Sequence, residues 1–101
     1  MILHAVYFDP CDDPEELRSI MTGLADLVGQ IDGFLEFSHG PNIDAEGKSS
    51  EASYGFVCTF ATARALATYA QDARHRALGA RLVAMCGGAE AIKVYDIDTI
   101  D

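Results

Sequence analysis

Residues 2–8, Ile-Leu-His-Ala-Val-Tyr-Phe, would present apolar side chains on both faces of a β-strand. Their side chains alternate in two sets, with Ile2, Val6 and Phe8 on one face and Leu3, Ala5 and Tyr7 on the other. A strand with two apolar faces is typical of a central position in a sheet that is covered on both sides. The sequence therefore predicts that something packs against each face of this strand.

A helix is predicted over residues 14–31, because its start, its buried face and its end each carry a sequence signal. Asp13 can cap the helix, Pro14 fits the first helical position, and Glu16 stands three residues after the cap, as in a capping box. Apolar residues then recur at helical spacing and form one continuous stripe. Asp32-Gly33 follows the stripe and is expected to end the helix.

A second helical region is predicted over residues 62–70 and 73–86, with an interruption near Gln71-Asp72. The carboxylate of Asp72 could cap the second half, because an aspartate at this position accepts bonds from the first free N–H groups of a helix. Gly87-Gly88 follows and is expected to end the second half.

Three further strands are predicted at residues 34–38, 54–60 and 92–97, and a polar loop over residues 40–53 joins the first two. The order β-α-β-β-α-β within one domain, residues 1–101, predicts an α+β, ferredoxin-like sandwich. Both helical regions would lie on one face of a four-stranded antiparallel sheet. The other face would then be exposed although its side chains are apolar or small, so a second copy of the chain is expected to cover it.

Charge limits the classes of partner. The chain has 16 acidic and 7 basic residues, a net charge of −9, while half of its residues are apolar. The apolar half excludes intrinsic disorder. Nucleic acid and anionic membrane surfaces both require clustered positive charge, so this acidic balance argues against both partners.

Cysteine usage and the N-terminal sequence indicate the compartment. Cys11, Cys58 and Cys86 are odd in number, widely spaced and form no CxxC motif, which argues against a disulfide framework and a zinc knuckle. The first residues lack a basic region and soon reach Asp9-Pro10, unlike a signal peptide. No apolar run approaches the roughly 20 residues of a membrane span. A cytoplasmic location with free thiols is expected.

The loop at residues 40–53 imitates two ligand-binding motifs without completing either. Gly47-Lys48-Ser49 resembles the end of a phosphate-binding loop, but Asn42 stands where the motif needs its first glycine. The acidic pattern from Asn42 to Gly47 resembles the start of a calcium loop, but Ser53 stands where a bidentate glutamate is required. The sequence therefore predicts neither a cofactor nor a metal site.

Two of the three histidines and one tyrosine are candidates for chemistry. His4 lies on an apolar strand face, His75 shares a helical stripe with apolar residues, and Tyr69 continues a similar stripe in the preceding half-helix. Partial burial would keep a histidine neutral near pH 7 and able to accept a proton, and a phenol could donate to a carbonyl oxygen. The other interpretation is a hydrogen-bonded core pair. His39, beside Gly40-Pro41, is expected to be exposed and structural.

The sequence resembles the stress-responsive A/B barrel (Dabb) family of small dimeric α/β-barrel proteins over about residues 2–98. Short matching segments occur in the family's order and spacing, and this combination makes the match specific. They are Ile2-Leu3-His4-Ala5-Val6, Ile31-Asp32-Gly33-Phe34, Gly40-Pro41-Asn42 with Glu46-Gly47-Lys48-Ser49, Tyr54-Gly55-Phe56-Val57 with Phe60, Ala65-Leu66 with Tyr69 and His75, and Val94-Tyr95-Asp96.

The resemblance implies a homodimer whose two sheets pack into a barrel. One plant member is polyketide-cyclase-like and performs a cofactor-free aldol condensation with a His, a Tyr and a second His that match His4, Tyr69 and His75. Carried over, this chemistry would make His75 the general base and Tyr69 a donor to a carbonyl oxygen, and His4 would assist orientation or protonation. The sequence departs from the family at Asp72-Ala73, where a His-Pro step is common.

Two functions therefore stay open. The first is a stress-associated homodimer of unassigned activity that binds a small apolar ligand and whose histidines satisfy the core. The alternative is a cofactor-independent acid/base enzyme acting on a small apolar carbonyl or aromatic compound, of polyketide-cyclase-like type or, more distantly, a cofactor-free monooxygenase. Haem degradation is disfavoured because the haem-degrading relatives rely on a tryptophan, and this chain has none.

Overall fold

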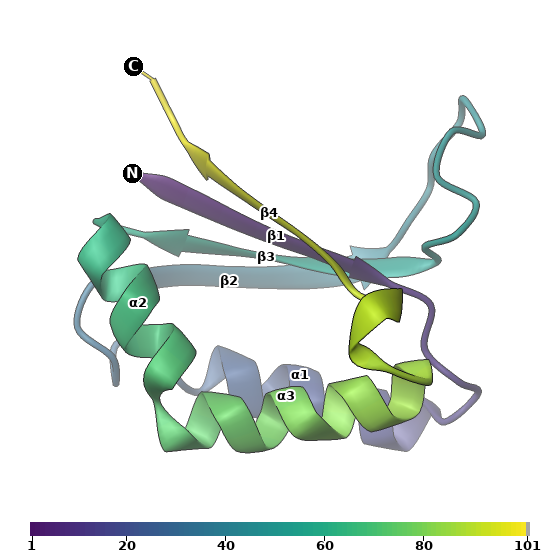
Figure 1. Cartoon of the computed structure of the whole chain (residues 1–101), viewed down its shortest axis with the longest axis horizontal. Coiled ribbons are helices and arrows are strands. Elements are labelled where there is room, and N and C mark those ends of the chain that lie inside the picture. Colours follow the sequence, from purple (N-terminus) through teal and green to yellow (C-terminus); the bar gives the residue numbers. More distant parts are fainter. Residues whose placement is uncertain (101) are drawn as a thin grey trace.

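The computed structural model describes residues 1–100, which form one antiparallel sheet with its helices on a single face (Figure 1). The strand order is β2-β3-β1-β4, with every neighbouring pair antiparallel. The elements in chain order are β1 (Ile2–Phe8), α1 (Pro14–Ala25), β2 (Phe34–Pro41), β3 (Tyr54–Phe60), α2 (Ala63–Gln71), α3 (Ala73–Cys86), a short 3-10 helix η1 (Ala89–Ala91) and β4 (Lys93–Asp98). The predicted α+β, ferredoxin-like sandwich is confirmed.

Strand β1 occupies a central position, as its two apolar faces predict. Ile2, Val6 and Phe8 point to the helices and are buried in the core. Residues paired across antiparallel strands share a face, so the register also places Phe56, Cys58 and Phe60 of β3 on the helix side. The core lies between this face and the apolar stripes of the helices, with Ile20, Met21, Leu24, Leu82 and Met85 among its buried members.

Helix α1 begins as predicted and ends earlier. The Asp13 carboxylate accepts a bond of 3.1 Å from the N–H of Glu16, so the predicted cap is confirmed. The helix stops at Ala25, and the prediction that it continues to residue 31 is wrong. Tight turns follow instead, with Gly29 at a φ of +79°. These turns bury Leu27 and Ile31 as well as a helix would, which explains why the apolar spacing was misleading.

The break between α2 and α3 forms at the predicted residue. The Asp72 carboxylate accepts a bond of 2.9 Å from the N–H of Arg74 and caps α3, while its extended backbone ends α2. The Thr62 hydroxyl caps α2 through the N–H of Ala65. Gly87 ends α3 in the left-handed region at a φ of +83°, as expected. The break gives α2 and α3 different directions (Figure 1).

The polar loop is shorter than predicted and internally bonded. Strand β2 extends to Pro41, so the loop covers residues 42–53. Both carboxylate oxygens of Asp44 are occupied, because they accept bonds from the N–H groups of Glu46 and Lys48 and from the Ser49 hydroxyl. These bonds, which lower the pKa of Asp44, explain the acidic pattern as turn chemistry.

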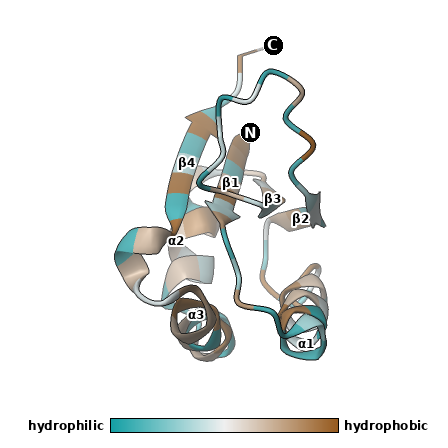
Figure 2. Ribbon diagram, turned by 90° about the vertical axis from the view of Figure 1, so that its right-hand side faces the viewer, coloured by the Kyte–Doolittle hydropathy of each residue, from teal (hydrophilic) through white to brown (hydrophobic). Residues whose placement is uncertain are grey.

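The sheet face opposite the helices carries exposed apolar side chains, as the double-sided first strand implies. We call this face the open face. Figure 2 shows the helices on one side of the sheet and apolar residues along β4. The large exposed side chains that the register and the alternation of the strands place on the open face are Tyr7, Tyr95 and Ile97. Among residues 1–100, no helix is long and apolar enough to cross a bilayer.

Candidate functional site

The three side chains selected from the sequence come from three different elements and meet on the helix side of the sheet. His4 lies on β1, Tyr69 on α2 and His75 on α3, just after the Asp72 break. The rings of Tyr69 and His75 are 4.0 Å apart between centroids, and those of His4 and Tyr69 are 5.8 Å apart. The fold therefore brings all three together in what we call the His-Tyr-His cluster.

Strand pairing gives His4 a carboxylate partner. The register of β1 and β4 places Asp96 directly opposite His4, and the His4 Nδ1 is 2.5 Å from the Asp96 Oδ1. The His4 side chain is only 12% exposed, whereas Asp96 lies on the exposed edge strand. A carboxylate can only accept, so it favours the tautomer with the proton on Nδ1 and leaves Nε2 free.

Sequence reasoning missed Asp96 as a functional residue. The resemblance includes it only as part of a terminal motif, and no spacing rule connects residues 4 and 96. A signal was nevertheless available, because a ferredoxin-like order places the last strand beside the first. Alternation then puts Val94 and Asp96 on the face that contains His4 and Val6.

Tyr69 lies at the centre of the cluster and is 1% exposed. Its ring packs against Phe34 and Phe60, with centroid distances of 5.1 and 4.9 Å. Its hydroxyl is buried and has no hydrogen-bond partner among residues 1–100; the neighbouring polar group is the thiol of Cys58. Burial raises the pKa of Tyr69 far above its ordinary range, so the phenol keeps its proton and can act as a neutral donor.

His75 differs from His4 in its environment. Burial lowers the pKa of His75, an effect that the bond to the Ala70 carbonyl opposes and that the nearby His4 reinforces. The His75 Nδ1 is 3.3 Å from the carbonyl oxygen of Ala70, which accepts a hydrogen bond from that nitrogen and leaves Nε2 free. The imidazole is therefore neutral at pH 7 and able to accept a proton. The cluster thus combines a neutral acceptor, a neutral donor and a second imidazole held by a carboxylate.

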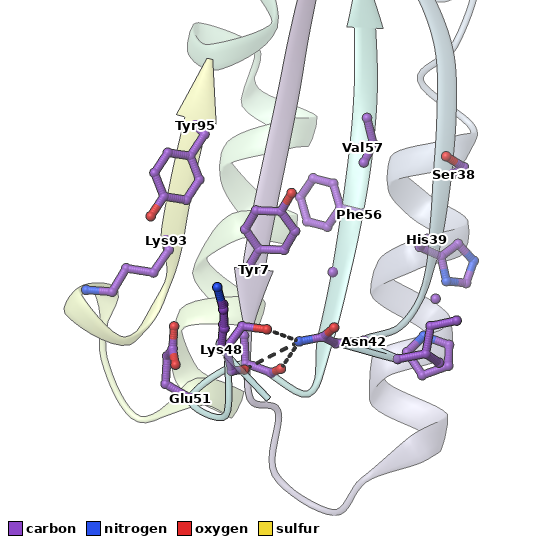
Figure 3. A pocket seen from close by; sticks show the side chains of 16 residues that line it. Tyr7, Ser38, His39, Asn42, Lys48, Glu51, Phe56, Val57, Lys93 and Tyr95 are labelled. Atoms are coloured by element: carbon purple, nitrogen blue, oxygen red, sulfur yellow. Dashed lines mark hydrogen bonds between the residues drawn. The ribbon is translucent and has the colours of Figure 1, made fainter. Parts of the chain in front are cut away.

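The structure also contains a cavity, which lies on the open face and not at the cluster (Figure 3). Its volume is about 700 Å³, and it lies between the sheet and the loop at residues 42–53. Figure 3 shows Tyr7 and Tyr95 on neighbouring strands and Asn42 and Lys48 from the loop. His39 lies at its margin, exposed as predicted, and its Nδ1 is 2.6 Å from the Tyr54 hydroxyl.

The arrangement offers groups that can donate and accept protons. Within residues 1–100, no three His, Cys, Asp or Glu side chains lie together as metal ligands. The cluster places two imidazoles next to one buried phenol, a combination that can donate and accept protons.

Comparisons with known proteins relate the chain to one family. The model of the stress responsive A/B barrel domain (Dabb) matches residues 2–98. A dimeric ferredoxin-like protein of unknown function from Jannaschia sp. CCS1 is 38% identical, with a TM-score of 0.91 and coverage of 97% of this chain and 98% of that chain.

Two plant structures share the fold at lower identity. A protein from Arabidopsis thaliana is 21% identical with a TM-score of 0.82, over 100% of this chain and 97% of that one. A hydroxynitrile lyase from Passiflora edulis is 13% identical with a TM-score of 0.80, over 99% and 96%. No curated protein matched the chain. With its family model covering residues 2–98, the chain belongs to the stress-responsive A/B barrel (Dabb) family.

Proposed function

We propose that the protein is a homodimer that uses the His-Tyr-His cluster for proton transfer on a small, mostly apolar carbonyl compound. The observation that carries this proposal is the buried Tyr69 hydroxyl, which has no partner in the described chain and belongs to a ring that neighbours both imidazoles. An unpaired buried hydroxyl costs about 1–3 kcal/mol. A ligand oxygen that accepts its proton would recover this cost.

Each side chain of the cluster has a distinct role in the proposed reaction. The neutral His75 would remove a proton from the carbon next to the carbonyl. Tyr69 would donate to the carbonyl oxygen and stabilise the negative charge that develops there. His4, oriented by Asp96, would return or relay the proton. The residues alone supply the donor and the acceptors that this chemistry requires.

Access to the cluster is favoured at β4. Val94 and Asp96 point to the helix side of the sheet and are nevertheless exposed, so the helices leave this part of β4 uncovered. His75 is only half-buried, which leaves part of its ring accessible beside the break. A small ligand could therefore approach the cluster between β4 and the break between α2 and α3.

The reaction is tested by deuterium exchange at the α-carbon of acetophenone and phenylacetaldehyde in D₂O, followed by proton NMR. His75→Asn should lower the exchange rate about 100-fold or more, because it removes the general base. The rate should still be level at pH 6.5, the ordinary histidine pKa, and should fall only at lower pH, because burial lowers the pKa of His75. His39→Asn, on the edge strand β2 and outside the cluster, is the matched control and should leave the rate unchanged.

The non-catalytic alternative is favoured by the position of the cavity, which lies on the open face. In this alternative the histidines would only make hydrogen bonds within the core. His75→Asn would then change the stability of the protein, and the wild type would show no catalysed exchange. The two proteins are compared with both probe compounds. If the wild type exchanges the α-proton no faster than the His75→Asn protein, the result favours the non-catalytic alternative.

Homodimer formation is proposed from the open face. Its exposed apolar side chains need cover, and the relative with 38% identity is dimeric. Packing two such faces together would also enclose the cavity at the interface. Burial of the two apolar faces supplies the driving force for this association.

Light scattering at micromolar concentration should give about twice the chain mass of 10.9 kDa. Ile97→Lys should shift the protein to the monomer, because it places a charge on the open face. Val94→Lys is the matched control, since Val94 lies on the same strand with similar exposure, 50% against 52%, but points to the helix side. A wild-type monomer would contradict the homodimer.

A further inference from the structure

Two cysteines that are far apart in the sequence meet at the C-terminal end of α3. Cys11 lies in the segment between β1 and α1, and Cys86 is the last residue of α3. The backbone N–H of Cys11 donates to the carbonyl oxygen of Met85 over 3.0 Å. Figure 1 shows the segment after β1 running down beside this end of α3. The bond satisfies one of the carbonyl groups that a helix end leaves without an internal partner.

This backbone bond joins Cys11 to the residue before Cys86 and so places the two cysteines side by side. A disulfide requires such proximity, because it joins Cα atoms that are about 4.4–6.8 Å apart. The two thiols are close enough to influence each other. Burial raises the pKa of the Cys86 thiol, and the neighbouring Asp9 carboxylate and Cys11 thiol raise it further.

The two thiols differ in accessibility. A stepwise oxidation requires one exposed thiol that the oxidant can reach and a second thiol close to it. Cys11 is exposed, and Cys86 is half-buried at the edge of the core. Cys58, the third cysteine, is completely buried on β3, and burial raises its pKa to about 12. Cys58 should therefore stay a thiol under conditions that oxidise Cys11, and it provides an internal control.

The geometry points to a reversible disulfide between Cys11 and Cys86 as an oxidation site of this protein, with a hydroperoxide as the oxidant. The Cys11 thiolate attacks a peroxide oxygen, the O–O bond breaks, and a sulfenic acid and water form. Cys86 then attacks the sulfenic sulfur and loses its proton, and the oxygen leaves as water. Two thiols and one hydrogen peroxide thus give one disulfide and two waters. A dithiol reductant reverses the step.

Oxidation would increase the stability of the fold. The disulfide would fix the segment after β1 to the C-terminal end of the helix, whose first turn carries His75. It would also close a long loop of the chain, so the oxidised protein should unfold at a higher temperature than the reduced one. This site is separate from the His-Tyr-His cluster, and its existence does not depend on the proposed reaction.

The test is hydrogen peroxide treatment of the folded wild-type protein, followed by alkylation, trypsin digestion and mass spectrometry. The three cysteines fall on separate tryptic peptides, residues 1–18, 49–64 and 82–93. We expect a mass loss of about 2 Da per chain, one cross-link between peptides 1–18 and 82–93, and complete alkylation of peptide 49–64. The melting temperature should rise on oxidation and return on reduction.

Variants separate this pairing from non-specific oxidation. Cys11→Ser and Cys86→Ser should each abolish both the cross-link and the reversible rise in melting temperature, whereas Cys58→Ala should retain the cross-link. A link between two copies of peptide 1–18, conversion of Cys11 to higher oxides without a cross-link, or three thiols still open to alkylation would each overturn the proposal.

Discussion

Replacing Tyr69 with phenylalanine should stabilise the fold and at the same time remove the proposed proton-transfer activity. The substitution deletes only the hydroxyl, which is buried and unpaired in the described chain, and keeps the ring between Phe34 and Phe60. Removing an unsatisfied buried hydroxyl should raise the free energy of unfolding by about 1 kcal/mol. For a chain of this size the melting temperature should rise by roughly 4–8 °C.

The same substitution should reduce α-proton exchange by about 100-fold or more. Without the phenol, no donor remains at the position where charge develops on the carbonyl oxygen, and donors of this kind contribute about 3–4 kcal/mol to catalysis. If the variant gains stability and loses activity, the hydroxyl is present for function although it lowers the stability of the fold.

Tyr54→Phe provides the matched control, because it removes a phenolic hydroxyl that does have a partner, the His39 Nδ1 at 2.6 Å. This variant should be no more stable than the wild type and should keep the exchange rate. A lower melting temperature for Tyr69→Phe would show that the hydroxyl supports the fold, through Cys58 or another group, and would contradict the role assigned to it.

Local chemistry made most of the fold predictable. Asp13, Asp72 and Gly87 each act within a few residues of their own position, and each ends or begins a helix where expected. The end of α1 was not predictable from spacing, because Leu27 and Ile31 reach the core from turns as well as they would from a helix. The apolar pattern of a sequence shows which residues are buried. Different backbone conformations can bury the same residues, so the pattern does not fix where the helix ends.

The candidate site was predictable in part for a similar reason. His4, Tyr69 and His75 stand on apolar faces, so periodicity alone points them into the same layer of the fold. The partner of His4 required the strand register, since Asp96 stands on a strand whose residues are all exposed. The position of the cavity depends on the path of a polar loop, which has no periodicity to follow.

Gly33→Ala should strongly destabilise the protein, because the turn before β2 needs a residue without a side chain for two separate reasons. Gly33 has a φ of +82°, in the left-handed region that costs other residues about 1–2 kcal/mol. A methyl group at this position would also lie 2.6 Å from the Cβ of Ala65 in α2. Overpacking of this kind costs about 1–3 kcal/mol, so a total loss of about 3 kcal/mol is expected in urea unfolding.

Gly29→Ala separates the two causes. Gly29 has a similar φ of +79°, but apart from its chain neighbours no atom of residues 1–100 lies within 4 Å of a methyl group there, so its substitution should cost only the backbone strain. That strain is about 1–2 kcal/mol. The difference in unfolding free energy between the two variants measures the cost of the close contact with α2. Adding Ala65→Gly to Gly33→Ala removes that contact and should restore this part of the lost stability. Equal losses at both glycines would contradict this explanation. Tyr69 follows Ala65 by one helical turn, so the close approach that Gly33 permits lies on the same face of α2 as the phenol of the cluster.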